Sequence, residues 1–376
     1  MYVIQARNVN EAYRHGMQLI SNQGVRQHSR AGEVLVINRP VTTVYERPLE
    51  RVLFDPKRDA NPIFHLMESI WMLAGMRDAR WLDQFVSDFS KRFAEDDGNA
   101  HGAYGYRWRN HFHREKTEPG DFSPSQIIDQ ILECGQLLLK DPTTRQAAMS
   151  MWDPAIDLGA KKRDIPCNDM VMFRGRYDHI DQIWLLDTTV LCRSNDIIWG
   201  AYGANAVHMS FMAEVVAALA GMKVGRYYQV SNNYHAYLDI FNKMHPPVCP
   251  TGPYSTTIGG DPYQLGMAIS SPAFAQSKYA YLGDSRKQTS EKGEKFLVAC
   301  EAFMNDRSIA KDVPVFFDEV VYPIMRAHRD YWKQGKKLEA LDIIRGMKAS
   351  DWQLATMQWM GRRIQSNLNT QDVRDK

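Results

Sequence analysis

Cys167 is the residue whose type and surroundings most clearly suggest covalent chemistry. It follows Pro166, which restricts the local backbone, and it precedes a strand-like run of apolar residues. Arg163 and Arg174 lie close to it in the sequence, and a nearby cation favours the thiolate, the nucleophilic form of cysteine. A free cysteine taken at random is more often a small core residue. The sequence therefore offers Cys167 as a candidate nucleophile, with a core position as the alternative.

Glu68 is a carboxylate within an apolar helical pattern, which sets it apart from an ordinary surface glutamate. Apolar residues recur at helical spacing over residues 63–73, directly after Pro62. A run rich in β-branched residues precedes this helix and predicts a strand over residues 33–44. We therefore expect a strand followed by a helix that carries Glu68 among apolar neighbours.

The middle of the chain is rich in strand-forming segments. Apolar, β-branched and aromatic residues separated by turn signals predict strands over residues 146–153, 169–177, 181–194 and 226–238. Between the last two, residues 205–222 are apolar nearly all round and predict a buried helix. Because no repeat or low-complexity linker divides the chain, we expect one α+β catalytic domain over residues 1–285 and a helical C-terminal extension over residues 286–376.

The composition narrows the classes of function. Of 376 residues, 44% are hydrophobic and 24% are charged, as in a globular protein. Lys and Arg total 46 against 44 for Asp and Glu, so the net charge of +2 gives no general basic field for nucleic acid. We expect neither secretion nor membrane insertion, because no signal pattern or long apolar run is present. Five cysteines without a CxxC pair argue against disulfides and a metal site, and favour the cytoplasm.

Six motifs occur in one order along the chain: YGYRWR, TRQAAMSMWDP, DIPCNDMVMF, LCRSNDIIWG, GAN and NNYHAYL. Together they resemble the thymidylate synthase family, which includes phage pyrimidine hydroxymethylases, over roughly residues 20–245. The resemblance implies a thymidylate synthase-like α+β fold, in which a mixed β-sheet packs with helices. It also implies a homodimer formed through a face of the sheet.

The resemblance implies a mechanism as well. The thiolate of Cys167 would add to C6 of a pyrimidine nucleoside monophosphate, which makes C5 nucleophilic toward 5,10-methylenetetrahydrofolate. Glu68 would organise proton transfer at O4, Tyr104 would assist removal of the C5 proton, and Arg193 would contact both phosphate and nucleophile. Such a thiol needs a pKa lowered by arginine to act at neutral pH. Cys192, where relatives commonly have Gln, is expected to be structural.

The remaining site residues are also carried over by motif match. The phosphate would be bound by Arg30, Ser194 and, from the partner subunit, Arg145, since arginine offers paired donors to phosphate. His235 and Tyr237 would bind the sugar hydroxyl, and Asp196 would hold the pterin of the folate. Asn205 would read the base, although one extra residue separates it from Arg193. Its amide suits uracil, whereas hydroxymethylases of dCMP carry Asp there.

Several departures from the family pattern bear on the product. Ser90 stands where relatives have a tryptophan that shields the transferred carbon from water, and Phe93 stands at a second aromatic position. Asn168 replaces the histidine that usually follows the nucleophile. The C-terminus lacks an apolar end. Gln146 stands where relatives have a second arginine that reaches the active site of the partner subunit. The changes at Ser90 and at the C-terminus favour water access and hydroxymethylation of dUMP or dCMP, with methylation of dUMP as the alternative. Asn168 is typical of a divergent branch, and Gln146 weakens the phosphate cluster by one charge. A catalytically silent nucleotide- or RNA-binding protein and a cysteine hydrolase that pairs Cys167 with a histidine also remain open.

Overall fold

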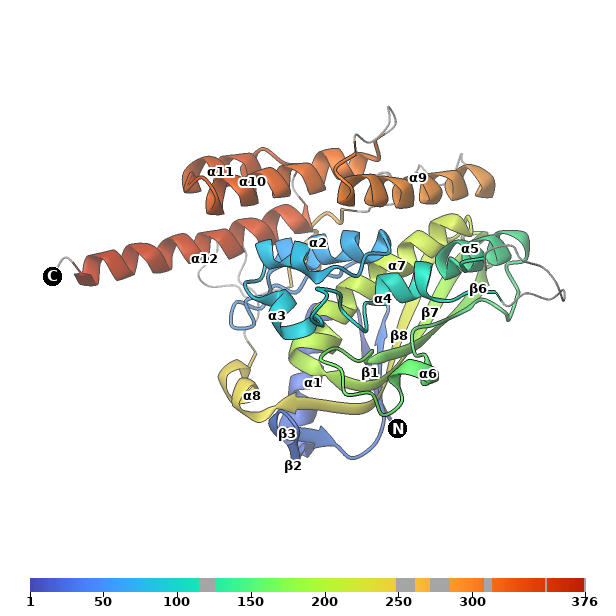
Figure 1. Cartoon of the computed structure of the whole chain (residues 1–376), viewed down its shortest axis with the longest axis horizontal. Helices are drawn as coiled ribbons and strands as arrows, with labels where there is room; N and C mark the ends of the chain where they lie inside the picture. The colour runs from blue at the N-terminus through green and yellow to red at the C-terminus, as the bar shows by residue number, and fades with distance from the viewer. Residues whose placement is uncertain (115–125, 248–260, 271–284, 308–312, 349, 375–376) are drawn as a thin grey trace.

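A mixed β-sheet forms the centre of the fold, with helices stacked in layers on it (Figure 1). The computed structural model describes residues 1–114, 126–247, 261–270, 285–307, 313–348 and 350–374, the last nine by their backbone alone. The strands run in the order β1, β4, β8, β7, β6, β5, and β3 joins β8 and β2. They are β1 (Tyr2–Ala6), β2 (Val25–Ser29), β3 (Gly32–Ile37), β4 (Val41–Tyr45), β5 (Ala148–Ser150), β6 (Asn168–Asp178), β7 (Ile183–Asp196) and β8 (Lys223–Tyr237).

Strand pairing brings the ends of β7 and β8 together. These two strands are parallel, as are β1 and β4, while β6 runs antiparallel to β7. The register places Ser194 beside Asn233, and Asp196 beside His235. The single strand predicted over residues 33–44 is in fact two, β3 and β4. Pro40 lies directly before β4, and a residue without an N–H group interrupts a strand ladder.

The first helical layer covers one face of the sheet. It contains α1 (Val9–Gln23) and α7 (Asn205–Leu219), and α7 is also covered by α2 (Pro62–Leu73) and α5 (Gln130–Lys140). Every residue of α7 is buried, as its all-round apolar character predicted. Short helical segments connect these elements: η1 (Ala79–Gln84), α3 (Phe89–Phe93), α4 (Tyr104–Tyr106), η2 (Arg107–His111), α6 (Pro154–Asp157), η3 (Ile197–Ala204) and α8 (Leu238–Met244).

The C-terminal helices form an outer layer on the side away from the sheet (Figure 1). α9 packs on α7, since a Cβ at Gly293 would lie 3.0 Å from the backbone nitrogen of Leu219. Arg286 also donates hydrogen bonds to the carbonyl groups of Leu138 and Ala220, each at 2.8 Å. The layer comprises α9 (Arg286–Met304), η4 (Phe317–Val321), α10 (Tyr322–Trp332), α11 (Lys337–Arg345) and α12 (Asp351–Arg374).

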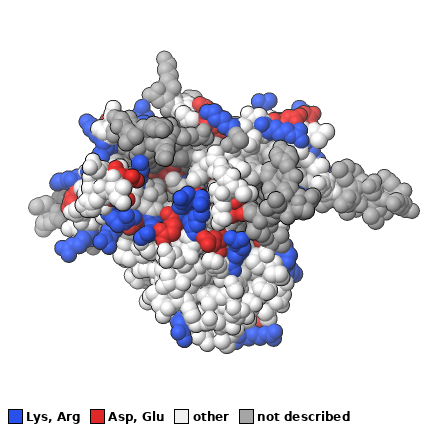
Figure 2. Space-filling model, turned by 180° about the vertical axis from the view of Figure 1, so that it is seen from behind, with Lys and Arg blue, Asp and Glu red and all other residues white. Residues whose placement is uncertain are grey.

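The other face of the sheet keeps apolar side chains at the surface. Val3 on β1 is 63% exposed, and Met170 and Met172 on β6 are 37% and 38% exposed. Seen from behind, the lower half of the molecule is a broad surface with few charged side chains (Figure 2). Within the described ranges, no helix combines the length and apolar character needed to cross a bilayer. The predicted α+β class, a mixed sheet packed with helices, is confirmed.

Candidate active site

Cys167 lies directly before β6, where Tyr104 fixes its backbone. The hydroxyl of Tyr104, from α4, accepts hydrogen bonds from the N–H of Cys167 at 3.1 Å and of Asn168 at 3.2 Å. Burial raises the pKa of Tyr104 well above its usual value, and the neighbouring Cys167 and Asp164 add to this rise. Tyr104 is therefore a neutral hydroxyl that touches the backbone of the nucleophile.

Arg193 on β7 binds the same turn from the other side. Its guanidinium donates to the carbonyl oxygens of Pro166 at 2.8 Å and Ile165 at 3.1 Å. The same group lies 3.9 Å from the Cys167 sulfur, and the Arg193 N–H donates to the Cys167 carbonyl at 3.0 Å. The turn before β6 therefore holds a thiol beside a fixed positive charge.

The pKa of Cys167 differs from the sequence expectation. Burial is the main cause of a raised thiol pKa, and Arg193 lowers it only in part. Asp164 and Asp169 raise it further, while Arg30 lowers it. The expectation of a lowered pKa is therefore wrong for the protein without nucleotide, because the loss of solvent around the sulfur outweighs the arginine charge.

A line of buried hydrogen bonds, here called the amide relay, runs through the residues beside the nucleophile. The Cys192 thiol donates to Asn168 Oδ1 at 2.8 Å, and Asn168 Nδ2 donates to Asn205 Oδ1 at 3.0 Å. Asn205 Nδ2 donates to Asn195 Oδ1 at 3.1 Å, and Asn195 Nδ2 donates to Ser231 at 2.9 Å. All five side chains are buried, as expected for Cys192. The relay fixes which way the Asn205 amide points.

Asn205 keeps hydrogen-bonding capacity beyond the relay. A primary amide has two N–H donors and an oxygen with two lone pairs, so one donor and one acceptor are left for a ligand. The side chain does not cap α7, whose N-cap position is Ala204. Before Asn205, the π-helical turn η3 contains Gly203 with non-helical torsions, φ −106° and ψ −105°. A π-helical turn accommodates one extra residue, which accounts for the longer spacing from Arg193.

Glu68 forms a pair that the sequence analysis did not identify. Its carboxylate, on α2, lies 3.1 Å from Nε2 of His208 on α7, and their side chains are 11% and 2% exposed. His208 follows Asn205 by one helical turn, and residues at this spacing share a helix face. The spacing of three residues between Asn205 and His208 is the sequence feature that could have identified His208. Glu68 and the base-reading candidate are thereby linked through one face of α7.

Four predicted phosphate and sugar ligands lie on β7, on β8 and in the turn between β2 and β3. His235 and Tyr237 lie on one face of β8, with ring centroids 5.6 Å apart. Arg30 is exposed in the turn between β2 and β3, and its charge lowers the pKa of both Cys167 and Tyr237. Ser194 is half-buried on β7, one residue after Arg193. The structure thus brings Arg30 and Tyr237 near Cys167, while His235 packs beside Tyr237 and Ser194 follows Arg193.

Arg145 is different, because it does not join this group within one chain. It is exposed in the segment that leads into the edge strand β5, and no contact in the described residues connects it to Cys167. Gln146 beside it is also exposed. This position fits a residue that acts outside its own chain, as the resemblance implies.

Asp196 offers a buried oxygen beside an exposed aromatic ring. Its Oδ1 accepts the N–H groups of Ile198 at 2.8 Å and Trp199 at 2.6 Å, which caps η3. Its Oδ2 is buried and has no hydrogen-bond partner among the described residues, and burial raises the pKa of the carboxyl. Trp199 is 47% exposed and packs 4.3 Å from the Arg58 guanidinium. This arrangement suits a flat heterocycle with N–H donors, such as a pterin.

Ser90 lies on α3, at the position where the family resemblance leads us to expect an aromatic side chain that shields the reacting carbon from water. Its N–H and hydroxyl both bind the Asp83 carboxylate, at 2.8 and 2.6 Å. Phe93 is 38% exposed at the end of α3. A small polar side chain therefore occupies the position at which the family resemblance leads us to expect an apolar shield.

The contacts of the Cys167 sulfur do not support a cysteine hydrolase. Its partners in the described part of the chain are the Ile165 carbonyl at 3.7 Å and Arg193, and no histidine is among them. A cysteine hydrolase needs a histidine within hydrogen-bond reach of the thiol.

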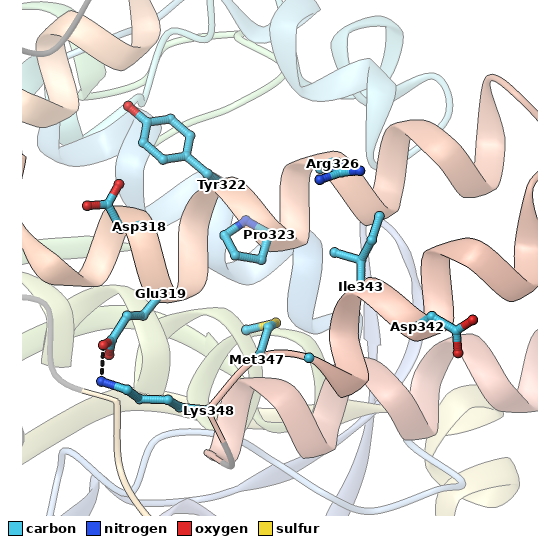
Figure 3. A pocket seen from close by; sticks show the side chains of 10 residues that line it. Asp318, Glu319, Tyr322, Pro323, Arg326, Asp342, Ile343, Met347 and Lys348 are labelled. Carbon is cyan, nitrogen blue, oxygen red and sulfur yellow. Dashed lines mark hydrogen bonds and ion pairs between the residues drawn. The ribbon is translucent and has the colours of Figure 1, made fainter.

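An open pocket in the C-terminal layer lies apart from these residues (Figure 3). Residues of η4, α10 and α11 line it, and Lys348 pairs with Glu319 at its edge. None of the predicted site residues lines this pocket.

Comparisons with known proteins identify a family and several relatives that this chain resembles. The profile of the family described as Thymidylate synthase matches residues 11–249. The deoxyuridylate hydroxymethyltransferase of Pseudomonas phage M6 is 38% identical over 367 residues, which cover 96% of this chain and 95% of that protein. The protein of the same name from Bacillus phage SP01 is 32% identical over 64% of this chain and 60% of its own length. A putative thymidylate synthase of Methanothermobacter marburgensis is 30% identical over 42% of this chain and 60% of its own length.

Proposed function

The chain belongs to the thymidylate synthase family, and on that premise we propose that it transfers a hydroxymethyl group to C5 of dUMP. It is a one-carbon transferase. In this proposal it acts through a covalent adduct of Cys167 with the pyrimidine ring. The observation that carries the choice of base is the fixed amide of Asn205 beside the nucleophile. The relatives named deoxyuridylate hydroxymethyltransferase support the same choice.

The amide relay supports uracil over cytosine. Uracil presents an N3–H donor and an O4 acceptor, whereas cytosine presents an N3 acceptor and an amine donor. A thiol is a weak donor and a weak acceptor, and here the Cys192 thiol donates to Asn168 Oδ1, which sets the direction of the relay. In that direction the Asn205 oxygen can accept N3–H while its NH₂ group donates to O4. Cytosine would require the amides to turn over and the relay to reverse its direction.

Each residue of the proposed site has its own role in the reaction. The Cys167 sulfur adds to C6, and the electron pair displaced from the C5–C6 bond makes C5 a carbon nucleophile. Arg193 stabilises the thiolate and, with Arg30 and Ser194, would hold the phosphate. The Glu68–His208 pair would hold and move the proton at O4. His235 and Tyr237 would bind the sugar hydroxyl.

The one-carbon donor in this proposal is 5,10-methylenetetrahydrofolate. The buried Oδ2 of Asp196 would accept N–H groups of its pterin, with the Trp199 ring nearby. When bound, the folate supplies a methylene group at the oxidation level of formaldehyde. Tyr104, as a neutral hydroxyl held by two backbone N–H groups, would order the water that removes the C5 proton.

Water access is the reason to propose a hydroxymethyl rather than a methyl product. Once C5 carries an exocyclic methylene group, hydride would give methyl and water would give hydroxymethyl. The hydroxyl of Ser90 and the open position of Phe93 leave that carbon without the aromatic shield described above.

The same proposal includes a cytoplasmic homodimer. The exposed apolar side chains of the outer sheet face, Met170 and Met172 among them, would be buried between two copies. Arg145 would then bind the phosphate in the partner's site.

Mass spectrometry of the nucleotide product tests the proposal. Purified protein is incubated with dUMP or dCMP and methylenetetrahydrofolate, and release of tritium from C5 is followed in parallel. We expect dUMP to gain the mass of formaldehyde. A gain of one methylene unit would instead identify a thymidylate synthase. If neither nucleotide releases tritium, the protein binds nucleotide without catalysing the reaction.

A further inference from the structure

Asp164 is a carboxylate beside the nucleophile that has no role in the mechanism above. Its Oδ2 accepts the backbone N–H of Gly102 at 3.1 Å. Gly102 belongs to the segment that leads into Tyr104, whose hydroxyl accepts the N–H of Cys167 at 3.1 Å. These two hydrogen bonds join the same two segments and fix the carboxylate relative to the sulfur.

Close packing makes this arrangement rigid. A Cβ at Gly102 would lie 2.9 Å from the Pro166 nitrogen and 3.0 Å from Asp164 Oδ2, so a larger residue would separate the two segments. The carbonyl groups of Ile165 and Pro166 are bound by Arg193. The backbone between Asp164 and the nucleophile is therefore held from both sides.

The charge of Asp164 acts on the reacting groups. It contributes to the raised pKa values of both Cys167 and Tyr104. Burial is the main cause that raises the pKa of Asp164 itself to about 6. The Gly102 N–H, His101 and Arg107 lower this pKa, and Glu68 raises it. A base with a pKa near the operating pH is well matched to take a proton from water.

Other acidic groups near the nucleophile already have a part in the proposed mechanism. Glu68 lies 3.1 Å from His208, Asp196 caps η3 through Oδ1 and keeps Oδ2 for the pterin, and Tyr104 is a neutral hydroxyl. Among the residues that the structure describes, Asp164 accepts one hydrogen bond and forms no ion pair, and its side chain is partly exposed. One of its oxygens can therefore face water.

We propose that Asp164 is the general base for the water molecule that attacks the methylene carbon on C5. This role rests on the proposed hydroxymethylation. The water oxygen bonds to the exocyclic carbon and its proton passes to the Asp164 carboxylate, while the electron pair of the exocyclic double bond moves to O4 as an enolate. The enolate then restores the C5–C6 double bond and expels the Cys167 sulfur as thiolate. Asp164 returns its proton to solvent.

Asp164→Asn separates this step from the earlier ones. The variant should bind dUMP like the unchanged protein in calorimetry and should still release tritium from C5. Formation of hydroxymethyl product should fall about a hundredfold or more, the usual contribution of a general base. Added 2-mercaptoethanol, which attacks as a thiolate and needs no base, should restore turnover and give the thioether adduct of the nucleotide.

Two further variants sharpen the test. Asp169→Asn removes another acid close to Cys167, with a pKa also raised by burial to about 6, and should keep hydroxymethyl as its product. Asp164→Glu should regain part of the lost hydroxymethylation. The proposal is overturned if Asp164→Asn forms hydroxymethyl product at the original rate, or if tritium release falls in parallel with product. If the unchanged protein yields a methyl product, the proposed function fails, and this role fails with it.

Discussion

At the scale of single residues, the direction of the Asn205 amide depends on the thiol of Cys192. Replacing that thiol by Val removes the donor that orients Asn168, so the relay can reverse. One buried hydrogen bond contributes about 1 kcal/mol, so we expect the preference for dUMP over dCMP to fall by about fivefold. Calorimetric binding of both nucleotides measures this ratio.

Cys134→Val is the matched control for this change. Cys134 is also buried, but among the described residues its thiol donates to the Ala148 carbonyl, at 3.7 Å, and it lies outside the relay. It should leave the ratio unchanged. An unaltered ratio in Cys192→Val would show that the relay does not set the choice of base.

The pKa of Cys167 gives a second prediction at this scale. The negative charge of Asp164 raises the thiol pKa, so Asp164→Asn should lower it. Alkylation by iodoacetamide follows the thiolate fraction, and its rate profile should move to lower pH. The profile is measured without nucleotide on intact protein, with Cys167→Ala to subtract reaction at other thiols. A shift to higher pH would contradict the electrostatic assignment.

Sequence reasoning proposed the nucleophile and the ligands that belong to contiguous motifs, and their roles stay predictions. It missed His208 and Asp164, because their roles come from contacts with Glu68 and Gly102, which lie far away in the sequence. It also gave the wrong direction for the pKa of Cys167. Nearby charges can be read from a motif, but loss of solvent depends on packing that a motif does not contain.

At the scale of elements, helix α7 buries a charge whose partner lies on another segment. Glu214 pairs with Arg51, and both side chains are fully buried. Glu214→Leu would remove the ion-pair partner of the buried guanidinium, at a cost of about 3–5 kcal/mol in the free energy of unfolding. Urea denaturation measures this loss. The double variant with Arg51→Leu should recover most of it, and a double variant as unstable as the single one would argue against a charge effect.

The helix and strand patterns were predicted well where periodicity is strong, as in α2 and α7. Residues 33–44 were not, since the β-branched pattern continues across the break at Pro40. Composition alone cannot show where a strand changes partner. Here β3 pairs with the end of β8 and β4 pairs with its middle, so the break lets one segment follow two parts of a long strand.

At the scale of the whole molecule, the family, fold class and type of reaction expected from the motifs are confirmed. The division into a catalytic domain of residues 1–285 and an extension of residues 286–376 stays a proposal. The hydrophobic core runs across that boundary, with Gly293 against Leu219, so the extension would stabilise the helix that carries Asn205 and His208.

The proposed dimer makes each active site depend on two chains, and mixing two inactive variants tests this. Cys167→Ala lacks the nucleophile but keeps Arg145, while Arg145→Ala keeps the nucleophile but lends no arginine. After joint refolding, half of the dimers should be mixed, each with one complete site, so about a quarter of the original activity should return. Dimers should be verified by light scattering. If Arg145 acts within its own chain, each mixed dimer has no site that combines both residues, and activity should not return.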